Sequence, residues 1–265
     1  MIITFLTDFG LRDAYVGAMK GVALTVAPQA TLIDITHLVP PQDVRTAALL
    51  LADYVPFYPS GSVHVAVVDP GVGSARRSLA IRLDLDGAQH TLVLPDNGLA
   101  WPLLQQATAY RAVVLREPRF WLPQVSSTFH GRDIFTPVAA HLALGLDLVE
   151  FGPPAGELVR LEIPLLRREG ERIIGHVVTI DHFGNCASSI RRSDLVAGVN
   201  YEVWIAGRNL GPLRRTFADV APGAALALFS SSGRVEVALR DGNAAQVLGI
   251  TCDTELELRA TRAMN

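Results

Sequence analysis

The stretch Val63 to Arg77, VHVAVVDPGVGSARR, constrains the fold more than any other part of the chain. It opens with β-branched and small apolar residues, typical of a strand buried on both faces, and residues 69–71 (Asp-Pro-Gly) end that strand with a carboxylate. Ligands bind at this carboxyl edge in open α/β sheets. The glycines allow a tight turn, so Arg76 and Arg77 can fold back toward Asp69. The segment predicts an acid and a guanidinium meeting at a strand end; a surface turn with solvated arginines is the alternative.

Length and charge narrow the class of protein. The 265 residues suffice for one large domain or two smaller ones, each with a sizeable core. The formal charge is −3, and no long run of Lys or Arg appears. A phosphate backbone needs a basic stripe, so no nucleic acid partner is expected.

The ends and the cysteines give further expectations. The chain opens on MIITFLTDFG, without a basic leader, and no apolar run approaches ~18 residues. We therefore expect a soluble, cytoplasmic protein with no membrane contact. Cys186 and Cys252 lie far apart and outside any CxxC motif. Both are predicted to be buried thiols and not a disulfide or a metal site.

The first residues predict a βα unit. Ile2 to Leu6 is a short apolar strand, after which TDFG places Asp8 at its carboxyl end. Apolar residues then recur at helical spacing from Asp13 to Ala27, with Asp13 as the expected N-cap and Pro28 as the stop. A DFG tripeptide also occurs in protein kinases, but the glycine-rich loop, strand lysine and HRD loop are missing here.

Further strands and one helix continue the α/β pattern. Strands are predicted over residues 30–36, 79–83, 90–94 and 111–115, and a helix over residues 44–55. The second and third of these strands form a pair joined by the turn DLDGAQ. After it, PDNG puts Asp96 and Asn97 beside a strand end, where an Asx turn without a ligand is the favoured interpretation.

A loop histidine precedes the last helix of this half. In STFHGRDIFTPVAAHLALG, Asp133 is the expected N-cap of a helix whose apolar face includes Ile134 and Val138, and Gly145 is the stop. His130 then stands just ahead of a helix N-terminus. Its spacing alone favours a solvated or turn-holding histidine over a chemical role.

Composition changes near residue 152. The segment FGPPAGELVRLEIP predicts a linker, and beyond it short alternating runs replace the helical pattern, at residues 173–180, 201–206, 224–229, 235–239 and 255–259. This pattern is typical of a small β-barrel or sandwich. We therefore predict an α/β domain over residues 1–155, a linker over 156–168 and a β domain over 169–265. Within the latter, IDHFGN ends another strand with a carboxylate, and SSSGR offers hydroxyls near a glycine.

Six segments, taken in order, resemble one family. TDFGLRDAYVG, DITHLVPPQD, VVDPGVGSARR, LPDNGL, FHGRD and IDHFGN are similar to the motifs of the S-adenosyl-L-methionine (SAM) hydrolases, also called SAM hydroxide adenosyltransferases. These enzymes are relatives of the fluorinating and chlorinating 5′-halogenases. The resemblance extends over nearly the whole chain.

The resemblance implies a fold, an assembly and a reaction. The fold would be an N-terminal three-layer α/β domain with a mostly parallel sheet, followed by a smaller C-terminal β-barrel. The assembly would be a homotrimer, with each active site between the N-terminal domain of one subunit and the C-terminal domain of the next. The reaction would be displacement at the ribose C5′ carbon of SAM by water or hydroxide, giving adenosine and L-methionine.

The resemblance also implies the catalytic residues. The family's Asp-Arg-His set falls on Asp69, Arg76 and His130, with Arg77 as the neighbouring candidate if the loop is displaced by one residue. A sulfonium is already a good leaving group, so the difficulty is activating water, whose pKa is near ~15.7. Asp69 or His130 could take the proton, and the sequence leaves both open. No metal and no cofactor are expected, because SAM is the substrate.

Binding roles carry over to residues from both predicted domains. Asp8 resembles the residue that takes the ribose 2′ and 3′ hydroxyls, because a carboxylate offers two acceptor oxygens. Asn185 resembles the contact to the adenine edge. The remaining implied contacts are to the methionine ammonium and carboxylate from Asp181, Asp13 and Ser232, with the register in Ser230 to Ser232 open, and to the adenine faces from Phe183 and Phe217.

Three alternatives remain. A chlorinase-like 5′-halogenase would use the same substrate, but an acid at Asp69 repels a halide, and the position corresponding to Asp69 carries tyrosine in halogenases. A SAM or adenosine sensor would bind without turnover. A metallophosphoesterase set of Asp8, Asp69, His130 and Asp181 is disfavoured because no HxH or DxH spacing accompanies these residues.

Overall fold

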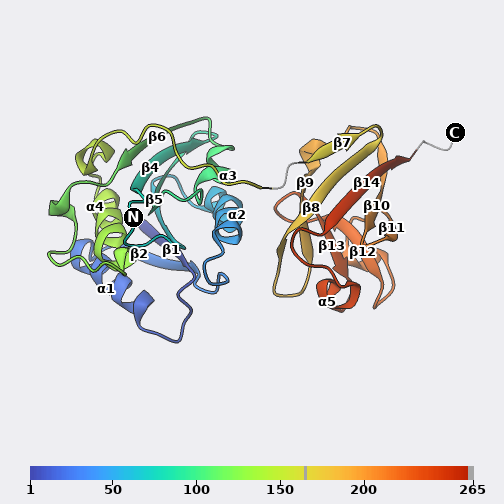
Figure 1. Ribbon diagram of the computed structural model, residues 1–265, viewed down its shortest axis with the longest axis horizontal. Helices are drawn as coiled ribbons and strands as arrows, with labels where there is room; N and C mark the ends of the chain where they lie inside the picture. Colours follow the sequence, from blue (N-terminus) through green and yellow to red (C-terminus); the bar gives the residue numbers. More distant parts are fainter. Residues whose placement is uncertain (164–165, 262–265) are drawn as a thin grey trace. The chain divides into compact units, whose positions relative to one another are not determined.

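The computed structural model describes residues 1–163 and 166–261 (Figure 1). The chain divides into two compact units, Met1–Leu161 and Glu162–Asn265. The first unit is α/β and the second is built mainly from antiparallel strands, so the predicted fold class is confirmed. The predicted linker, residues 156–168, and the predicted second domain both include residues outside the described ranges, and their boundaries stay predictions.

A six-stranded sheet with the order β2-β1-β3-β5-β4-β6 forms the centre of the first unit. Its strands are β1 (Ile2–Thr7), β2 (Thr31–Thr36), β3 (Ser62–Val67), β4 (Ser78–Leu85), β5 (Ala88–Pro95) and β6 (Ala109–Val114). Strands β2, β1, β3 and β5 pair in parallel, whereas β4 runs antiparallel to both of its neighbours. The sheet is thus mostly parallel, as predicted.

The reversed direction of β4 decides which residues meet. Parallel strands β1, β3 and β5 all end at one edge of the sheet, and the antiparallel β4 begins at that same edge. Residues just before β4 therefore lie near residues that follow β3 and β5. This edge brings Arg76 and Arg77 to the carboxylates of Asp69 and Asp96.

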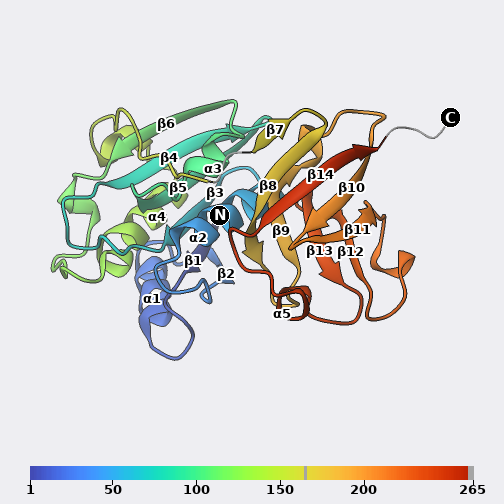
Figure 2. The same ribbon diagram turned by 45° about the vertical axis from the view of Figure 1, so that its right-hand side comes forward.

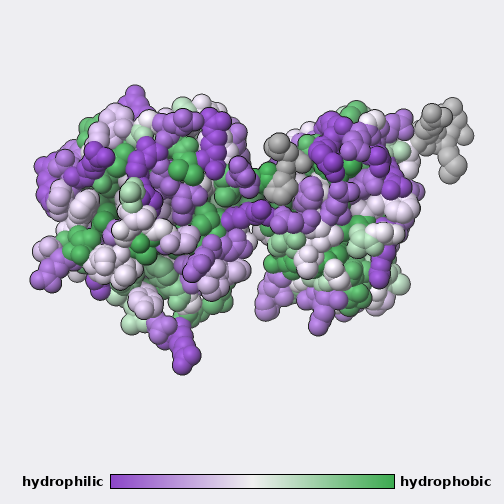
Figure 3. All heavy atoms as spheres, in the orientation of Figure 1, coloured by the Kyte–Doolittle hydropathy of each residue, from purple (hydrophilic) through white to green (hydrophobic). Residues whose placement is uncertain are grey.

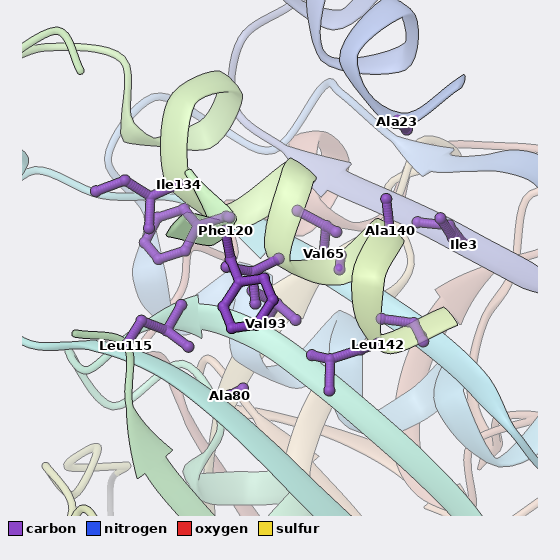
Figure 4. Close-up of a cluster of buried hydrophobic side chains, with 14 of the residues drawn as sticks. Ile3, Ala23, Val65, Ala80, Val93, Leu115, Phe120, Ile134, Ala140 and Leu142 are labelled. Carbon is purple, nitrogen blue, oxygen red and sulfur yellow. The ribbon is translucent and has the colours of Figure 1, made fainter. Parts of the chain in front are cut away.

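Helices cover both faces of this sheet. On one face, α1 (Tyr15–Val26) and α4 (Thr136–Ala143) pack on side chains such as Ile3, Val65 and Val93 (Figure 4). On the other face, α2 (Val44–Tyr54) and α3 (Trp101–Leu104) pack on Leu6 and Ala66. Alternate residues of each strand point to opposite cores, which explains why β3 is buried along its whole length. The unit has the three layers that were expected.

Two predicted helix caps are wrong. Helix α1 begins at Tyr15 with Ala14 at its N-cap position and no side-chain cap, so Asp13 is exposed in the preceding turn. Asp133 is fully buried inside a single π-helical turn, Gly131–Phe135, which precedes α4. Its carboxylate is held instead by Arg132 and by the Ser126 N–H. Short 3₁₀ turns complete the first unit at Val55–Phe57, Pro118–Phe120 and Leu148–Phe151.

The second unit is a nearly closed antiparallel sheet with the order β11-β10-β14-β8-β9-β13-β12, and β7 pairs with β8. Its strands are β7 (Arg167–Glu169), β8 (Arg172–Ile180), β9 (Cys186–Arg191), β10 (Asn200–Ile205), β11 (Arg208–Pro212), β12 (Ala225–Phe229), β13 (Arg234–Leu239) and β14 (Glu255–Thr261). Figure 2 shows β8 and β14 side by side. A parallel bridge from Arg214 to Leu228 joins the two ends of the sheet, which favours the barrel over the open sandwich.

The sequence missed several elements here. These are β7, β9, β11, helix α5 (Ala244–Leu248) and the 3₁₀ turns Arg192–Asp194 and Phe217–Asp219. Helix α5 is capped by Asn243, whose side chain accepts from the Gln246 N–H, and it ends at Gly249 in the left-handed region. It is too short for its periodicity to be recognised in the sequence.

The surface mixes residue types. On the face drawn in Figure 3, hydrophilic residues are spread over both units and are interspersed with hydrophobic ones. In the part of the chain described here, no helix has the length and apolar character needed to cross a bilayer. Cys186 is buried as predicted, whereas Cys252 is exposed, which corrects the prediction of two buried thiols.

Candidate active site

The carboxylate that follows β3 is bound by a guanidinium from its own loop. Arg76 Nε lies 3.0 Å from both carboxylate oxygens of Asp69, and Arg76 Nη2 donates to Asp69 Oδ2 at 2.5 Å. The Asp69 side chain is 5% exposed and that of Arg76 is 10% exposed. A forked contact of this kind fixes the plane of the carboxylate as well as its position. The acid and the guanidinium thus meet at the strand end, as the sequence predicted.

His130 joins the pair through the same guanidinium. Arg76 Nη2 lies 2.9 Å from His130 Nδ1, and Arg76 Nη1 donates to Ser78 Oγ at 2.6 Å. Because a guanidinium can only donate, Nδ1 must accept, and the hydrogen of the neutral imidazole is therefore on Nε2. Burial lowers the pKa of His130, and Arg76 lowers it further, although Asp69 and Asp133 act in the opposite direction. His130 is thus held as a neutral ring with a free N–H donor.

The turn between Asp69 and Arg76 depends on one glycine above all. Gly73 has φ +78°, and a Cβ at this position would lie 2.5 Å from the carbonyl oxygen of Ser127. The backbone of this loop therefore touches the segment that leads to His130. Ser74 Oγ adds a local bond to the Gly71 carbonyl, which tightens the same turn.

Arg77 belongs to a different pair. Its Nε donates to Asp96 Oδ2 at 2.7 Å, and its two terminal nitrogens donate to the carbonyls of Ala155 and Glu157. The structure therefore pairs Arg76, and not Arg77, with Asp69. Asp96 also accepts from the Val159 N–H, so this second pair holds the chain after residue 154.

Asn97 forms the expected turn. Its side-chain oxygen accepts from the Leu99 N–H, and its Nδ2 donates to the Val68 carbonyl at 2.9 Å. The bonds are internal to the fold, in line with the favoured interpretation of PDNG as a structural turn.

A cavity of ≈ 440 Å³, here called the N-terminal cavity, opens beside the Asp69 and His130 side chains. Asp8, which follows β1, lines the same cavity, and its Oδ2 accepts from the backbone N–H of Gln42 at 2.8 Å. The other lining residues are Phe9, Tyr15, Pro41, Gln42, Val67, Pro70, Val72, Thr128, Phe129 and Gly131. Three predicted site residues thus share one cavity.

Three aromatic residues of this cavity were not singled out as a group from the sequence. Phe9, Tyr15 and Phe129 contact one another edge to face, with ring centroids 5.2–5.9 Å apart. All three fall within two of the six family-like segments, TDFGLRDAYVG and FHGRD, so the resemblance held a signal for them. Their rings give the cavity an apolar wall next to its carboxylates.

A second cavity, of ≈ 860 Å³, lies on the second unit and is here called the C-terminal cavity. Four predicted binding residues line it, namely Asp181, Phe183, Asn185 and Phe217, together with Ser230 and Ser231. Ser232 is not among its lining residues, but Ser232 Oγ lies 3.0 Å from Ser230 Oγ. Asp13 is exposed and lines neither of these two cavities, so a role for it stays a prediction.

Asp181 organises the loop that carries two of these residues. Its Oδ1 accepts from the Phe183 and Asn185 N–H groups, and its Oδ2 accepts from Asn185 Nδ2 at 2.9 Å. This internal bonding fixes the Asn185 amide while Phe183 stays 71% exposed.

Glu236 is a lining residue that the sequence analysis missed. Burial raises its pKa to about 7, and the nearby Asp181 carboxylate acts in the same direction. It lies in β13 as one polar residue of an alternating run, RVEVAL, so only its place in the folded sheet distinguishes it.

The described residues contain no group of three or more His, Cys, Asp or Glu side chains that could hold a metal ion. The metallophosphoesterase alternative needed such a group from Asp8, Asp69, His130 and Asp181. The set that the structure does bring together is Asp69, Arg76 and His130, which offers an acceptor, a cation and an N–H donor at the rim of one cavity. This combination can hold a water molecule, accept its proton and stabilise charge on its oxygen.

Two family models match the chain. Residues 3–152 match the model described as SAM hydroxide adenosyltransferase N-terminal domain, and residues 175–257 match the corresponding C-terminal domain. Among curated proteins, the chain is 46% identical over 264 residues to "(R)-S-adenosyl-L-methionine hydrolase" from Salinispora tropica, with 97% of each chain covered. A protein of the same name from Thermus thermophilus is 43% identical, with 94% of this chain and 95% of the relative covered.

More distant similarity extends to halogenating enzymes and to solved structures. A "Fluorinase" from Nocardia brasiliensis is 31% identical, with 89% of each chain covered. The crystal structure of an uncharacterized conserved protein from Thermotoga maritima superposes with a TM-score of 0.88 at 33% identity, covering 97% of this chain and 99% of that one. The similarity therefore includes both sequence and fold.

Proposed function

The chain belongs to the SAM hydroxide adenosyltransferase family, and we propose that it hydrolyses SAM to adenosine and L-methionine. The observation that carries this function to the present chain is the Asp69–Arg76–His130 set at the rim of the N-terminal cavity. The relatives named as SAM hydrolases are more similar to this chain than the relative named as a fluorinase. The comparison therefore favours hydrolysis of SAM, with water as the nucleophile, over halogenation.

The reaction is an in-line displacement. The oxygen of a water molecule attacks C5′ of the ribose, and the C5′–S bond breaks with its electron pair passing to sulfur, which leaves as the thioether of methionine. The water proton passes to a base as attack proceeds and then to solvent. Alignment of oxygen, C5′ and sulfur in a site closed to bulk water supplies much of the rate.

We assign the base to Asp69. His130 Nδ1 already accepts from Arg76, so the ring offers its Nε2–H as a donor that can hold the attacking oxygen. Arg76 orients the Asp69 carboxylate and supplies positive charge beside the developing hydroxide. The sequence left the choice between Asp69 and His130 open, and the contact between Arg76 and His130 Nδ1 supports Asp69.

Binding roles follow the two cavities. Asp8 takes the ribose hydroxyls in the N-terminal cavity. The adenine lies between Phe183 and Phe217 in the C-terminal cavity, with its edge at Asn185. Asp181, Ser230 and Ser231 of the same cavity meet the amino acid end of the substrate, and Ser232 acts beside Ser230. We propose that one subunit's N-terminal cavity and another subunit's C-terminal cavity form each complete site in a homotrimer. A cytoplasmic location stays a prediction.

The deciding experiment is incubation of the purified protein with SAM in ¹⁸O-labelled water, with and without chloride and with EDTA, followed by chromatography and mass spectrometry. The proposal expects adenosine with the label in its 5′ hydroxyl, independent of both additives. Release of 5′-chloro-5′-deoxyadenosine would establish the halogenase instead. SAM recovered intact but bound would establish a sensor.

The trimer has its own test. Light scattering gives the mass of the assembly. Mixed trimers of Asp69→Asn and Asn185→Ala subunits, refolded together, should regain activity that neither variant has alone, because some sites then join two unaltered halves. Mixed trimers without activity contradict shared sites.

A further inference from the structure

The segment DITHLVPPQD, residues 34–43, has no part in the proposed chemistry, yet it binds the loop that carries Asp8. Strand β2 lies next to β1 in parallel, so the residues after both strands are neighbours. The Gly10 N–H donates to the His37 carbonyl at 2.8 Å, and His37 Nδ1 lies 2.8 Å from Thr7 Oγ1. His37 therefore contacts the loop both before and after Asp8.

The Asp34 carboxylate favours one tautomer of His37. His37 Nε2 lies 3.0 Å from Asp34 Oδ1, and a carboxylate can only accept, which favours a hydrogen on Nε2. In that neutral tautomer Nδ1 accepts from the Thr7 hydroxyl. The Thr7 oxygen then accepts from the Phe9 N–H at 3.2 Å. Thr7 is fully buried and His37 is 2% exposed, so bulk water does not compete for these bonds.

Asp34, which contacts His37, also forms an ion pair with Lys20. Lys20 Nζ lies 2.5 Å from Asp34 Oδ2. Burial alone would raise the pKa of Asp34, but its hydrogen bonds to Lys20 and His37 outweigh burial and lower the pKa. Asp34 therefore stays ionised and favours a hydrogen on His37 Nε2.

The same segment also reaches the Asp8 carboxylate itself. Gln42 has φ +65°, in the left-handed region that a residue with a side chain adopts at a cost. Its backbone N–H points at Asp8 Oδ2, 2.8 Å away. The Asp8 carboxylate thus accepts a hydrogen bond from Gln42. Thr7 and Gly10, on either side of Asp8, form hydrogen bonds to His37.

We propose that His37 is a positioning residue, which acts through Thr7 and the backbone of residues 9–10 to aim the Asp8 carboxylate at the two ribose hydroxyls of the substrate. The inference rests on the proposed function for the identity of the ligand. The prediction is that loss of the His37–Thr7 bond impairs recognition of the ribose hydroxyls more than it impairs binding of the base.

The first unit provides a matched control. Thr4 Oγ1 and His64 Nδ1 lie at the same 2.8 Å, three residues earlier on β1, and His64 is equally buried. This second pair contacts neither Asp8 nor its loop among the described bonds. A change at His64 therefore tests what loss of a buried Thr–His bond does to the fold alone.

The experiment compares His37→Gln, Thr7→Val, Thr7→Ser and His64→Gln. Calorimetry measures the binding of adenosine and of 2′,3′-dideoxyadenosine, and SAM hydrolysis gives KM and kcat. His37→Gln and Thr7→Val should lower the preference for adenosine about tenfold and raise KM for SAM more than they lower kcat. Thr7→Ser keeps the hydroxyl and should retain the preference, as should His64→Gln.

A double-mutant comparison separates positioning from general damage. In an Asp8→Asn background, His37→Gln should cause no further loss of the preference, because its effect passes through Asp8. Equal loss for both nucleosides, the same loss in His64→Gln, or a wild-type protein without the preference overturns the inference. A wild-type protein that prefers adenosine but leaves SAM intact defeats the proposed function and leaves the inference standing.

Discussion

Two Asp–Arg pairs lie next to each other at the ligand edge of the first sheet, and they differ in their surroundings. Asp69, held by Arg76, lines a cavity and has His130 within reach of the same guanidinium. Asp96, held by Arg77, is enclosed by backbone groups of residues 155–159. The residue types are the same, and access to the cavity separates a chemical pair from a structural one.

Asparagine at the two positions should have opposite effects. Asp69→Asn should lower kcat by about 10²–10⁴-fold, because the amide cannot take the water proton. Asp96→Asn should lower the free energy of unfolding by about 2 kcal/mol and leave kcat nearly unchanged, because it weakens the hold on residues 155–159. Steady-state kinetics and chemical denaturation measure both, and an Asp69→Asn enzyme with full kcat would contradict the assigned base.

Replacing Arg76 should change the titration of His130 in a direction fixed by charge. Arg76 lowers the pKa of His130, so Arg76→Gln should raise this pKa, which a histidine NMR titration measures. Arg76→Lys keeps the charge but loses the fork on Asp69. It should lower kcat while raising the pKa of His130 less, and an unchanged pKa in Arg76→Gln would contradict the electrostatic contact.

Elements differ in how far the sequence predicts them. The strand β3 and the hairpin of β4 and β5 are visible because β-branched runs and a glycine turn are local features. The π-helical turn before α4 was missed, since it forms through contacts such as Thr136 Oγ1 to the Gly131 carbonyl and through burial of Asp133. Strand β9 was missed because its serines interrupt the apolar pattern.

The loop from β3 to β4 should be intolerant of any side chain at one position. Gly73→Ala has both a left-handed φ and a Cβ 2.5 Å from the Ser127 carbonyl, so it should cost about 2–3 kcal/mol and lower kcat by moving Arg76. Gly61→Ala is the control, with φ +86° and open space around its Cβ, and should cost about 1 kcal/mol without affecting kcat. Thermal unfolding and kinetics measure both variants, and equal effects would show that the Ser127 contact is unimportant.

At the scale of the molecule, residue patterns alone predict neither the order of the strands nor the two cavities. The edge position of Asp69 and Asp8 follows from strand ends, but their shared cavity depends on β1 and β3 being neighbours, which only the folded sheet shows. Glu236 and the aromatic wall of Phe9 and Phe129 were missed for the same reason. The family resemblance supplied most candidate residues, because it carries spatial information that periodicity lacks.

Acid should destabilise the first unit through a histidine that has no part in the proposed chemistry. Burial lowers the pKa of His64 to about 3, with a contribution from His90, while the rings of Tyr54 and Tyr58 and the hydroxyl of Thr4 face it. The unfolded chain protonates near pH 6.5 and the folded chain does not. Stability from this group is therefore complete above about pH 6.5 and falls by about 1.4 kcal/mol per pH unit below it.

Denaturation curves at several pH values between 7.5 and 5 test this dependence. In His64→Gln the free energy of unfolding should depend less on pH, because the variant lacks the histidine whose pKa differs between the folded and unfolded chains. An unchanged slope would assign the acid sensitivity to other residues.

The single reversed strand, β4, also orders events in time. Its pairing with β5 is local in the sequence and brings Arg77 to Asp96, whereas His130 reaches Arg76 from 54 residues further along the chain. Local pairings generally form before distant ones. A refolding chain should thus form the Arg77–Asp96 pair early and add His130 to the reactive set late, so that return of activity reports docking of the segment around His130.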